Sequence, residues 1–253
     1  MSDHFQHLPP FVQKSPAEEA EVTPLPDHDR ISIILPVLNE AAGMRGCLGA
    51  IQNLRHAGHE VIVVDGGSRD ETQELAAPLA DQVIATRGGR GTQMNQGAAA
   101  ASCDTLLFLH ADTLLPLRAD ELIRVALSGG QHTWGRFDVR LSGQARMFRV
   151  IESLMNRRSR LTGIATGDQA IFIRRSAFAA VGGFPEIPLM EDIAISKRLK
   201  QLSRPACIRN RVVTSSRRWE EGGIWRTIIK MWRLRLAYFL GVEPDELARR
   251  YRT

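Results

Sequence analysis

The stretch EVIVVDGGSRDET, residues 60–72, decides the fold of this chain. It opens with a short β-rich run that ends in Asp65, and two glycines and several helix-capping residues follow. A nearly continuous apolar run closed by a turn is typical of a buried strand in a parallel sheet. Ligands of open α/β sheets bind outside the carboxyl ends of the strands, so we expect Asp65 to face a ligand.

The same pattern recurs from residue 31 onward. Further β-rich runs are ISIILPV (31–37), DQVIAT (81–86) and DTLLFLH (104–110), and helical stretches near 41–57, 70–79 and 92–101 separate them. This alternation predicts a parallel sheet covered by helices on both faces. Beyond Pro116 the pattern predicts strands at 134–141, 169–174 and near 206–214, and helices near 118–128, 144–158, from 176, and 191–202. No linker intervenes, so we expect one α/β domain with a mixed, Rossmann-like sheet.

Charge is distributed unevenly over the chain, whose net charge is +5. Residues 1–30 hold six acidic and two basic residues, and five prolines lie among the first 29, which predicts a flexible acidic leader over 1–29. From residue 201 onward, twelve basic residues face five acidic ones. A basic end favours an anionic partner, namely a nucleotide diphosphate, an anionic bilayer or nucleic acid.

The composition predicts a cytoplasmic protein. No run approaches the roughly 18 apolar residues of a membrane span, and the first residues do not resemble a secretory signal. The three cysteines lack a CxxC spacing, which excludes a zinc knuckle and a disulfide framework.

A glycine-rich segment and a segment that begins with a proline both predict ligand contacts beside Asp65. RGGRGTQMNQG (87–97) opens an Ala-rich helix, where backbone amides and Arg90 suit a phosphate, although a flexible surface loop has the same composition. PVLNE (36–40) ends the first strand at a proline and exposes Glu40 at the carboxyl edge, or else forms a helix-capping turn.

Two further acidic residues complete the predicted site. Asp112 follows the apolar run LLFL, and one carboxylate with diphosphate oxygens and water is typical of Mg²⁺ or Mn²⁺. His110 beside it is interpreted as a supporting residue. Asp192 opens a helix in MED (190–192), where an acid also interacts favourably with the helix dipole.

These motifs, in this order, resemble those of family 2 glycosyltransferases. PVLNE, VVDGGSRDET, HAD, GDQAIFIRR, GGF and MEDIAISKRL follow one another between residues 31 and 202, and GRGxQMNxGA and RRW are similar to a small bacterial subgroup. The resemblance implies the GT-A fold and a nucleotide-diphospho-sugar donor, with UDP as the default. No GxGxxG follows the first strand and no GxxxxGK[ST] occurs, so neither a Rossmann dehydrogenase nor a P-loop enzyme is indicated.

The resemblance also implies residue roles. Pro36, Glu40 and Asp65 would hold the nucleoside, and Asp112 matches the last acid of the metal-binding DxD motif. Asp192 matches the catalytic base, which predicts transfer with inversion. The chain departs from the pattern at His110, where the first Asp of DxD is usual, and SSRRW (215–219) lacks the Gln of QxxRW, which argues against processive synthesis.

The remaining site residues are expected around this centre. Gly67 allows a close backbone approach to the nucleotide. The donor-sugar or acceptor side is assigned to Trp134, Asp168, Gln169 and Glu191. Trp134 fits a sugar-stacking wall or a buried strand aromatic equally well. The diphosphate candidates are Arg218 and Arg235, the latter because it lies in the middle of an apolar helix face and needs a partner.

That helix, residues 224–240, is amphipathic and belongs to a basic extension (223–253) of the main domain (30–222). Two interpretations stay open, packing across the core or lying at the inner face of the membrane to meet a lipid-linked acceptor. The rival functions are a nucleotidyltransferase and a non-catalytic nucleic-acid-binding protein. The first lacks its GGxGTRL motif, and the second lacks a helix-turn-helix or an aromatic-basic signature, so we expect no nucleic-acid partner.

Overall fold

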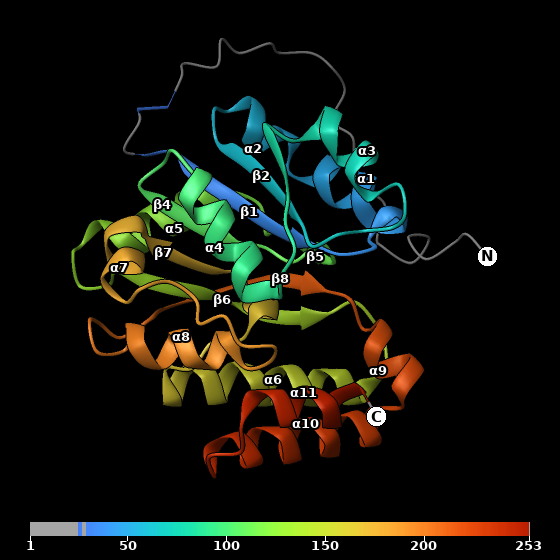
Figure 1. The fold of residues 1–253 in the computed structure, drawn as a ribbon. Coiled ribbons are helices and arrows are strands. Elements are labelled where there is room, and N and C mark those ends of the chain that lie inside the picture. The colour runs from blue at the N-terminus through green and yellow to red at the C-terminus, as the bar shows by residue number, and fades with distance from the viewer. Residues whose placement is uncertain (1–24, 27–28, 253) are drawn as a thin grey trace.

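The computed structural model describes residues 25–26 and 29–252 (Figure 1). The predicted leader lies almost entirely outside the described residues. Within them, one sheet has the strand order β3-β2-β1-β4-β7-β6-β8-β5. Its strands are β1 Ile31–Val37, β2 Glu60–Asp65, β3 Gln82–Ala85, β4 Thr105–Phe108, β5 Thr113–Leu114, β6 Trp134–Leu141, β7 Ile171–Arg174 and β8 Ala206–Thr214.

Helices cover both faces of this sheet (Figure 1). They are α1 Ala41–Ala50, α2 Gln52–His56, α3 Thr72–Ala76, α4 Arg90–Ala100, α5 Ala119–Ser128, α6 Arg146–Thr162, α7 Arg175–Ala180, α8 Glu191–Leu199, α9 Arg217–Gly222, α10 Ile224–Phe239 and α11 Pro244–Arg252. The 3₁₀ turns are η2 Ala77–Leu79 and η3 Gly167–Gln169.

The sheet has a parallel half and a mixed half. Strands β3, β2, β1 and β4 run parallel, with Val37 of β1 opposite Asp65 of β2. Strand β7 is antiparallel to both β4 and β6, and β6 pairs in parallel with β8. The carboxyl ends of β1, β2 and β4 therefore meet at one edge. The predicted single α/β domain with a mixed sheet is confirmed.

Alternation along the buried strands supplies two cores. Ile33 and Leu35 of β1 belong to the core beneath α1 and α5, whereas Ile34 belongs to the core beneath α4, α7 and α8. Helix α4 lies close to β1 because Gly97 has no side chain, since a Cβ there would stand 2.4 Å from the Ile34 side chain. This packing fixes the start of α4 near the carboxyl edge.

Most predicted elements form at the expected places. The strands predicted at 134–141 and 206–214 have these bounds, while the helix predicted over 41–57 is divided at Ile51 and the one over 144–158 continues to Thr162. Strand β5 and helix α9 were not predicted, and α11 lies in the extension over 223–253, which was predicted to be helical without bounds for this second helix. Helix α11 did carry a signal, namely Pro244 at its first position and acids in its first turn.

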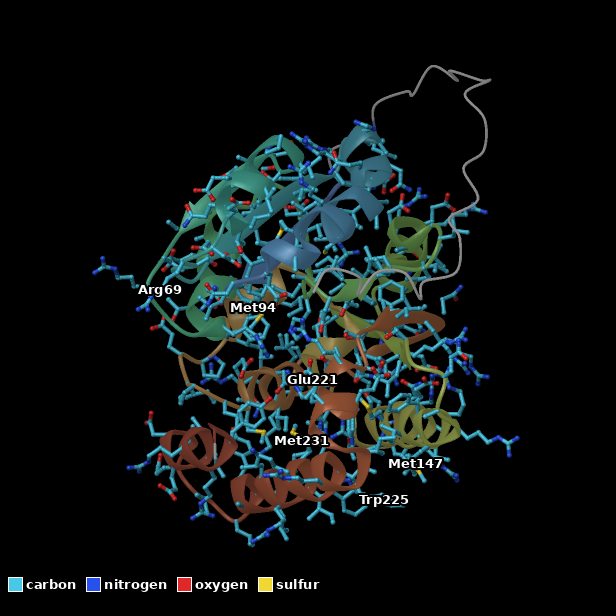
Figure 2. All side chains as sticks on the ribbon, turned by 90° about the vertical axis from the view of Figure 1, so that its right-hand side faces the viewer. Arg69, Met94, Met147, Glu221, Trp225 and Met231 are labelled. Carbon is cyan, nitrogen blue, oxygen red and sulfur yellow. The ribbon has the colours of Figure 1, made fainter. Side chains whose placement is uncertain are left out.

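Helix α10 packs on the domain and also exposes apolar side chains. Ile224 and Ile228 pack beside α6, and Leu234 is buried against the start of α8. Figure 2 shows Met231 on the side of α10 that faces the domain and Trp225 at the outer surface. No helix among the described residues is long and apolar enough to cross a membrane.

Candidate active site

The first two loops at the carboxyl edge are joined by hydrogen bonds. The backbone N–H of Asn39 donates to Ser68 Oγ at 2.8 Å, and the backbone N–H of Glu40 donates to Thr72 Oγ1 at 2.9 Å. These bonds cap the start of α1 with side chains of the β2 loop. In the alternative interpretation of PVLNE as a helix-capping turn, Asn39 would cap α1, but its Oδ1 accepts the backbone N–H of Arg69 at 2.9 Å.

Asp65 organises the turn that follows β2. Its carboxylate accepts the amides of Gly67 and Ser68 at 3.0 and 2.9 Å, Gln73 Nε2 at 2.8 Å, and the Ser68 hydroxyl. Burial raises the pKa of Asp65, but these bonds outweigh it and hold the pKa below its usual 3.8. Four bonds fill the roughly four acceptor positions of a carboxylate. Asp65 therefore shapes the loop, and its fully buried side chain offers a nucleoside no free acceptor in this state.

Glu40 lies among charged groups at the ends of β1 and β4. Burial raises its pKa, Asp112 adds to the rise, and the charges of Arg217 and His110 oppose it. These interactions place Glu40, Asp112, His110 and Arg217 in one neighbourhood. Pro36 is buried within β1 and contributes backbone shape to this edge.

Asp112 is the exposed carboxylate of this group. Its Oδ1 accepts the Thr113 hydroxyl at 3.3 Å, and its backbone oxygen accepts the Ser215 amide at 3.1 Å. The described residues contain no cluster of three or more His, Cys, Asp or Glu that could hold a metal ion by itself. A single exposed carboxylate still fits Mg²⁺ or Mn²⁺ that is shared with phosphate oxygens and water.

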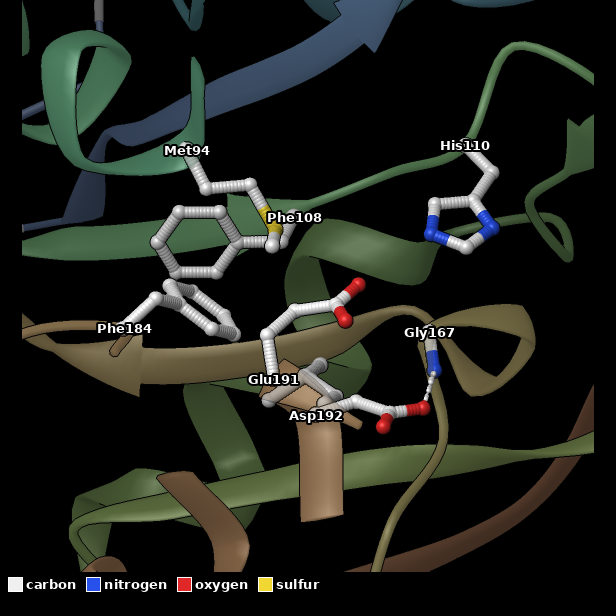
Figure 3. A pocket seen from close by; sticks show the side chains of 8 residues that line it. Met94, Phe108, His110, Gly167, Phe184, Glu191 and Asp192 are labelled. Carbon is white, nitrogen blue, oxygen red and sulfur yellow. Dashed lines mark hydrogen bonds between the residues drawn. The ribbon is translucent and has the colours of Figure 1, made fainter. Parts of the chain in front are cut away.

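Asp192 and His110 line one small pocket (Figure 3). The pocket measures about 10 Å³ and is lined by Met94, Phe108, His110, Gly167, Ile171, Phe184, Glu191 and Asp192. Asp192 Oδ2 accepts the Gly167 amide at 3.1 Å, and Oδ1 accepts the Ile193 amide at 2.7 Å. These bonds orient the carboxylate at the start of α8. Asp65 and Asp112 do not line this pocket.

Turn η3 is held against His110. A Cβ on Gly167 would stand 2.3 Å from the imidazole, so the ring lies directly over the backbone of this turn. His110 Nδ1 is 3.5 Å from Asp168 Oδ1. Burial raises the pKa of Asp168, but the hydrogen bond and charge of His110, with Arg218 and Arg90, lower it to about 2. Asp168 is therefore a carboxylate at neutral pH.

Glu191 is buried next to Asp192, and its carboxylate points into the pocket (Figure 3). Burial raises its pKa above 4.5 and the charge of Asp192 adds to the rise, while Arg90, whose Nη1 is 3.6 Å from Glu191 Oε1, opposes it. The contact draws Arg90, at the start of α4, toward the pocket.

Glu191→Gln should flatten the dependence of stability on pH. Because its folded-state pKa is raised, Glu191 stabilises the native state most below 4.5, and this contribution is lost as pH rises through the folded-state pKa. As pH rises from about 5 to 8, we expect the Tm of the variant to fall less than the Tm of the wild type. The exposed Glu186→Gln is the control. Equal slopes for Glu191→Gln and the wild type would contradict this account.

Two predicted sugar-side residues lie inside the protein. Trp134 is fully buried, and its indole N–H donates to the Ser203 oxygen at 3.0 Å. It is a buried strand aromatic, so the prediction of a sugar-stacking wall is wrong. Gln169 is also fully buried, and its Oε1 accepts the Thr166 amide at 3.2 Å. Its role is to shape η3, which presents Asp168.

The two diphosphate candidates occupy different places. Arg218 lies near Asp168, and its guanidinium is 5.9 Å from the centre of the Tyr251 ring. Arg235 interacts electrostatically with Asp192 and Asp168, and burial lowers its pKa. Its Nε is buried without a hydrogen-bond partner among the described residues.

Sequence reasoning missed three residues that the fold brings to the site. Arg217 lies beside Glu40, and its signal was the doubled arginine of SSRRW. Gly167 positions Asp192 through its amide, a backbone role that its side chain cannot reveal. Arg158 interacts with Asp192 from α6, but NRRSR reads as an ordinary solvated helix face.

The mixed sheet with a carboxylate-rich carboxyl edge defines a GT-A glycosyltransferase architecture. A family profile described as "Glycosyl transferase family 2" matches residues 32–181, and the chain belongs to this family. It is 43% identical over 108 residues to a "PGL/p-HBAD biosynthesis glycosyltransferase" of Mycobacterium bovis, a match that covers 40% of this chain and 42% of that protein. An uncharacterised glycosyltransferase of Mycobacterium tuberculosis is 34% identical over 85 residues, which cover 33% of this chain and 37% of that protein. The chain thus spans about two fifths of these relatives' length.

Solved structures share the fold at low identity. The mannosyltransferase PcManGT of Pyrobaculum calidifontis, in complex with GDP-Man and Mn²⁺, has a TM-score of 0.59 and 23% identity over 82% of this chain and 61% of that chain. Glucosyl-3-phosphoglycerate synthase of Mycobacterium tuberculosis, in complex with Mn²⁺ and UDP-Glc, has a TM-score of 0.55 and 21% identity over 73% of this chain and 70% of that chain. These neighbours confirm the predicted GT-A fold.

Proposed function

We propose that the protein transfers a sugar from a nucleotide-diphospho sugar to an acceptor hydroxyl with inversion, and that Asp192 is the general base. The observation that carries this proposal is the Asp192 carboxylate itself, which two backbone amides hold at the pocket of Figure 3. A carboxylate in that setting can accept a proton without acting as a nucleophile, and one base suffices for a single displacement.

Charge explains the roles of the other residues. The anomeric carbon gains positive character as the bond to the diphosphate lengthens, and negative charge collects on the diphosphate. Arg217, which lies beside Glu40, and Arg90, at the start of α4, would stabilise that negative charge. The loop that Asp65 organises presents backbone to the nucleotide, with Gly67 at a φ of 96° that favours glycine.

A divalent metal fits the same edge. Mn²⁺ is present in the solved structures of PcManGT and of the synthase described above. In this chain Asp112 would hold the metal, and the metal would neutralise part of the diphosphate charge. Asp168, held by His110, would lie toward the sugar.

A thermal-shift panel of nucleotide diphosphates and nucleotide sugars, with and without Mn²⁺, tests the proposal. One nucleotide diphosphate, with UDP as the default expectation, should raise the Tm, and Mn²⁺ should enlarge the rise because a ligand of the native state stabilises it. Release of free sugar from the stabilising nucleotide sugar should follow. A panel in which no nucleotide changes the Tm would remove the proposed function.

We also propose that α10 rests on an anionic membrane surface. Its outward face carries an apolar stripe whose members are between 55% and 68% exposed, namely Trp225, Ile229, Trp232, Leu236 and Phe239. These positions recur every three or four residues and so share one side of the helix. The exposed Arg226 and Arg233 accompany the stripe, and basic residues beside exposed tryptophans suit an anionic interface.

Flotation with vesicles tests the membrane contact. The protein should float with phosphatidylglycerol vesicles at low salt and less at high salt, since salt screens the basic residues. Trp232→Glu should abolish flotation, while Val125→Glu, at an apolar residue of α5 that is 72% exposed, should not. Absence of binding at both salt concentrations would leave only the packing role. Concentration-dependent dimerisation lost in Trp232→Glu would assign the stripe to a second copy of the chain.

A further inference from the structure

A group of buried donors behind the pocket has no protein partner. Among the described residues, the buried side-chain nitrogens without a hydrogen-bond partner are Arg136 Nε, Arg158 Nε and Nη2, Gln169 Nε2 and Arg235 Nε. The Ser159 hydroxyl, next to Arg158, is also buried and unpartnered. Most buried polar groups in proteins are hydrogen-bonded, so such a concentration of exceptions calls for an explanation.

These donors come from elements that meet near Asp192. Helix α6 packs on β6, and β6 contacts η3. The charge of Arg158 interacts with those of Arg235, Arg136 and Asp192, and that of Arg235 also interacts with Asp168. Arg136 is satisfied in part, since it pairs with Asp138. The guanidinium groups of Arg158 and Arg235 make no ion pair in the part of the chain that the structure describes.

Arg158 and Arg235 are half-buried, and the buried nitrogens of their guanidinium groups lack partners, which opposes folding. Burial lowers the pKa of Arg158 to about 10, and the nearby Arg235 adds to this effect. Arginine side chains keep their proton in proteins, so both groups carry positive charge. A buried cation without a partner destabilises the native state, so its presence is not explained by stability. Because these nitrogens are donors only and the two guanidinium groups are positively charged, an anion would both accept their hydrogen bonds and balance their charge.

We propose that the acceptor carries a phosphate group, which Arg158 and Arg235 bind beside Asp192. This inference rests on the proposed function and names its acceptor class. The leaving diphosphate is placed on the side of Asp112, Arg217 and Glu40. A single displacement puts the base and the acceptor on the opposite side of the sugar, which is where Arg158 and Arg235 interact with Asp192. A phosphate monoester carries about −1.5 to −2 at neutral pH, which two guanidinium groups would neutralise.

The same phosphate chemistry is available from a soluble metabolite or from a lipid. Arg235 belongs to α10, the helix that also carries the exposed apolar stripe. A helix of this kind at a bilayer would bring Arg235 within reach of a lipid phosphate, while a soluble phosphate ester needs no membrane. The experiment therefore has a soluble arm and a lipid arm.

In the soluble arm, inorganic phosphate is titrated against the protein already saturated with its best nucleotide diphosphate and Mn²⁺. Phosphate should raise the Tm further, because the diphosphate site is occupied and the arginine pair is not. Arg158→Gln and Arg235→Gln should weaken this binding about tenfold or more, as expected for a lost charge-assisted hydrogen bond. The matched controls, Arg157→Gln on α6 and Arg233→Gln on α10, alter exposed arginines and should bind phosphate as the wild type does.

Folding of the variants is checked separately. Removal of an unpaired buried charge should leave the Tm of the ligand-free protein unchanged or higher. Arg235→Lys, which keeps the charge but loses the planar fork, should retain part of the phosphate affinity. If Arg158→Gln or Arg235→Gln fails to fold, the phosphate affinities of Arg235→Lys and the wild type still show whether Arg235 binds phosphate.

Two results would overturn the inference. Phosphate without effect on the nucleotide-loaded protein would show that the arginine pair binds no anion. Phosphate that stabilises only the nucleotide-free protein, and competes with the nucleotide, would assign the pair to the donor diphosphate. Failure of the proposed function would give a different result from these two. No nucleotide would then change the Tm, while phosphate binding to the free protein would still depend on Arg158 and Arg235.

In the lipid arm, vesicles containing phosphatidic acid are compared with vesicles containing phosphatidylglycerol. Phosphatidic acid offers a terminal phosphate monoester, and phosphatidylglycerol offers negative charge without one. Tighter binding to phosphatidic acid that is lost in Arg235→Gln, but not in Arg157→Gln, at an exposed arginine of α6, supports a lipid-borne acceptor. Equal binding to both vesicles, together with Arg235-dependent binding of inorganic phosphate, supports a soluble acceptor.

Discussion

Asp192→Asn should lower turnover about 10²- to 10⁴-fold while leaving the affinity for the nucleotide donor unchanged. The amide keeps the shape of the carboxylate, and its oxygen can still accept the backbone N–H of Gly167, while the bond from the backbone N–H of Ile193 is lost, so we expect the pocket of Figure 3 to persist. It cannot take the proton of the acceptor hydroxyl. The loss should therefore fall on the chemical step, and donor binding, which we propose to use the loops after β1, β2 and β4, should be spared.

Single-turnover kinetics and donor affinity, measured on the same preparation, check this expectation. Glu186→Gln, in the exposed loop before α8, is the matched control and should keep wild-type turnover. Turnover near the wild-type rate in Asp192→Asn would remove Asp192 from the role of base. Equal losses of turnover and donor affinity would instead assign it to donor binding.

Asp112→Asn should remove the effect of Mn²⁺ on nucleotide binding. Asp112 is the exposed carboxylate of the edge, and its neighbour Thr113 already fixes its orientation. An amide oxygen binds a divalent cation more weakly than a carboxylate does, so the variant should hold the metal–diphosphate pair poorly. Loss of electrostatic stabilisation of a leaving group is worth about 10²- to 10³-fold in turnover.

Nucleotide affinity is measured over a range of Mn²⁺ concentrations to test this. In the wild type the affinity should rise with Mn²⁺, and in Asp112→Asn it should stay at the metal-free level. Asp104→Asn, at an exposed acid directly before β4, is the matched control because this residue lies at the opposite edge of the sheet from Asp112. An unchanged Mn²⁺ dependence in Asp112→Asn would place the metal elsewhere.

The fold could be predicted because its signals are local. Each buried strand of the parallel half is a short apolar run closed by a turn, and the strands at 134–141 and 206–214 were predicted with the bounds they have. Asp192 and Glu191 could also be predicted, since an acidic pair at a helix start is visible in the sequence. The hydrogen bond between Asp192 and the backbone N–H of Gly167 could not be predicted, because it joins residues 25 positions apart.

The missed features depend on tertiary packing. The apolar residues of α10 look alike in sequence, yet Met231 faces the domain and Trp232 the outside. Arg157 and Arg158 are neighbours, and only the second turns inward. Asp65 was expected to meet the nucleoside, but hydrogen bonds of its own turn occupy its carboxylate. In each case the sequence allows two environments for a side chain, and the packing of segments distant in sequence determines which one it has.

The hydrogen bonds between the loops after β1 and β2 bear on how this protein can be re-engineered. The amides of Asn39 and Glu40 depend on hydroxyl groups that belong to the other loop. In a chimaera that takes only one of these two loops from a relative, the backbone N–H groups of Asn39 and Glu40 would lose their hydroxyl acceptors. The start of α1 would then lack its caps. Recombination of nucleotide specificity should succeed when both segments are exchanged as one cassette.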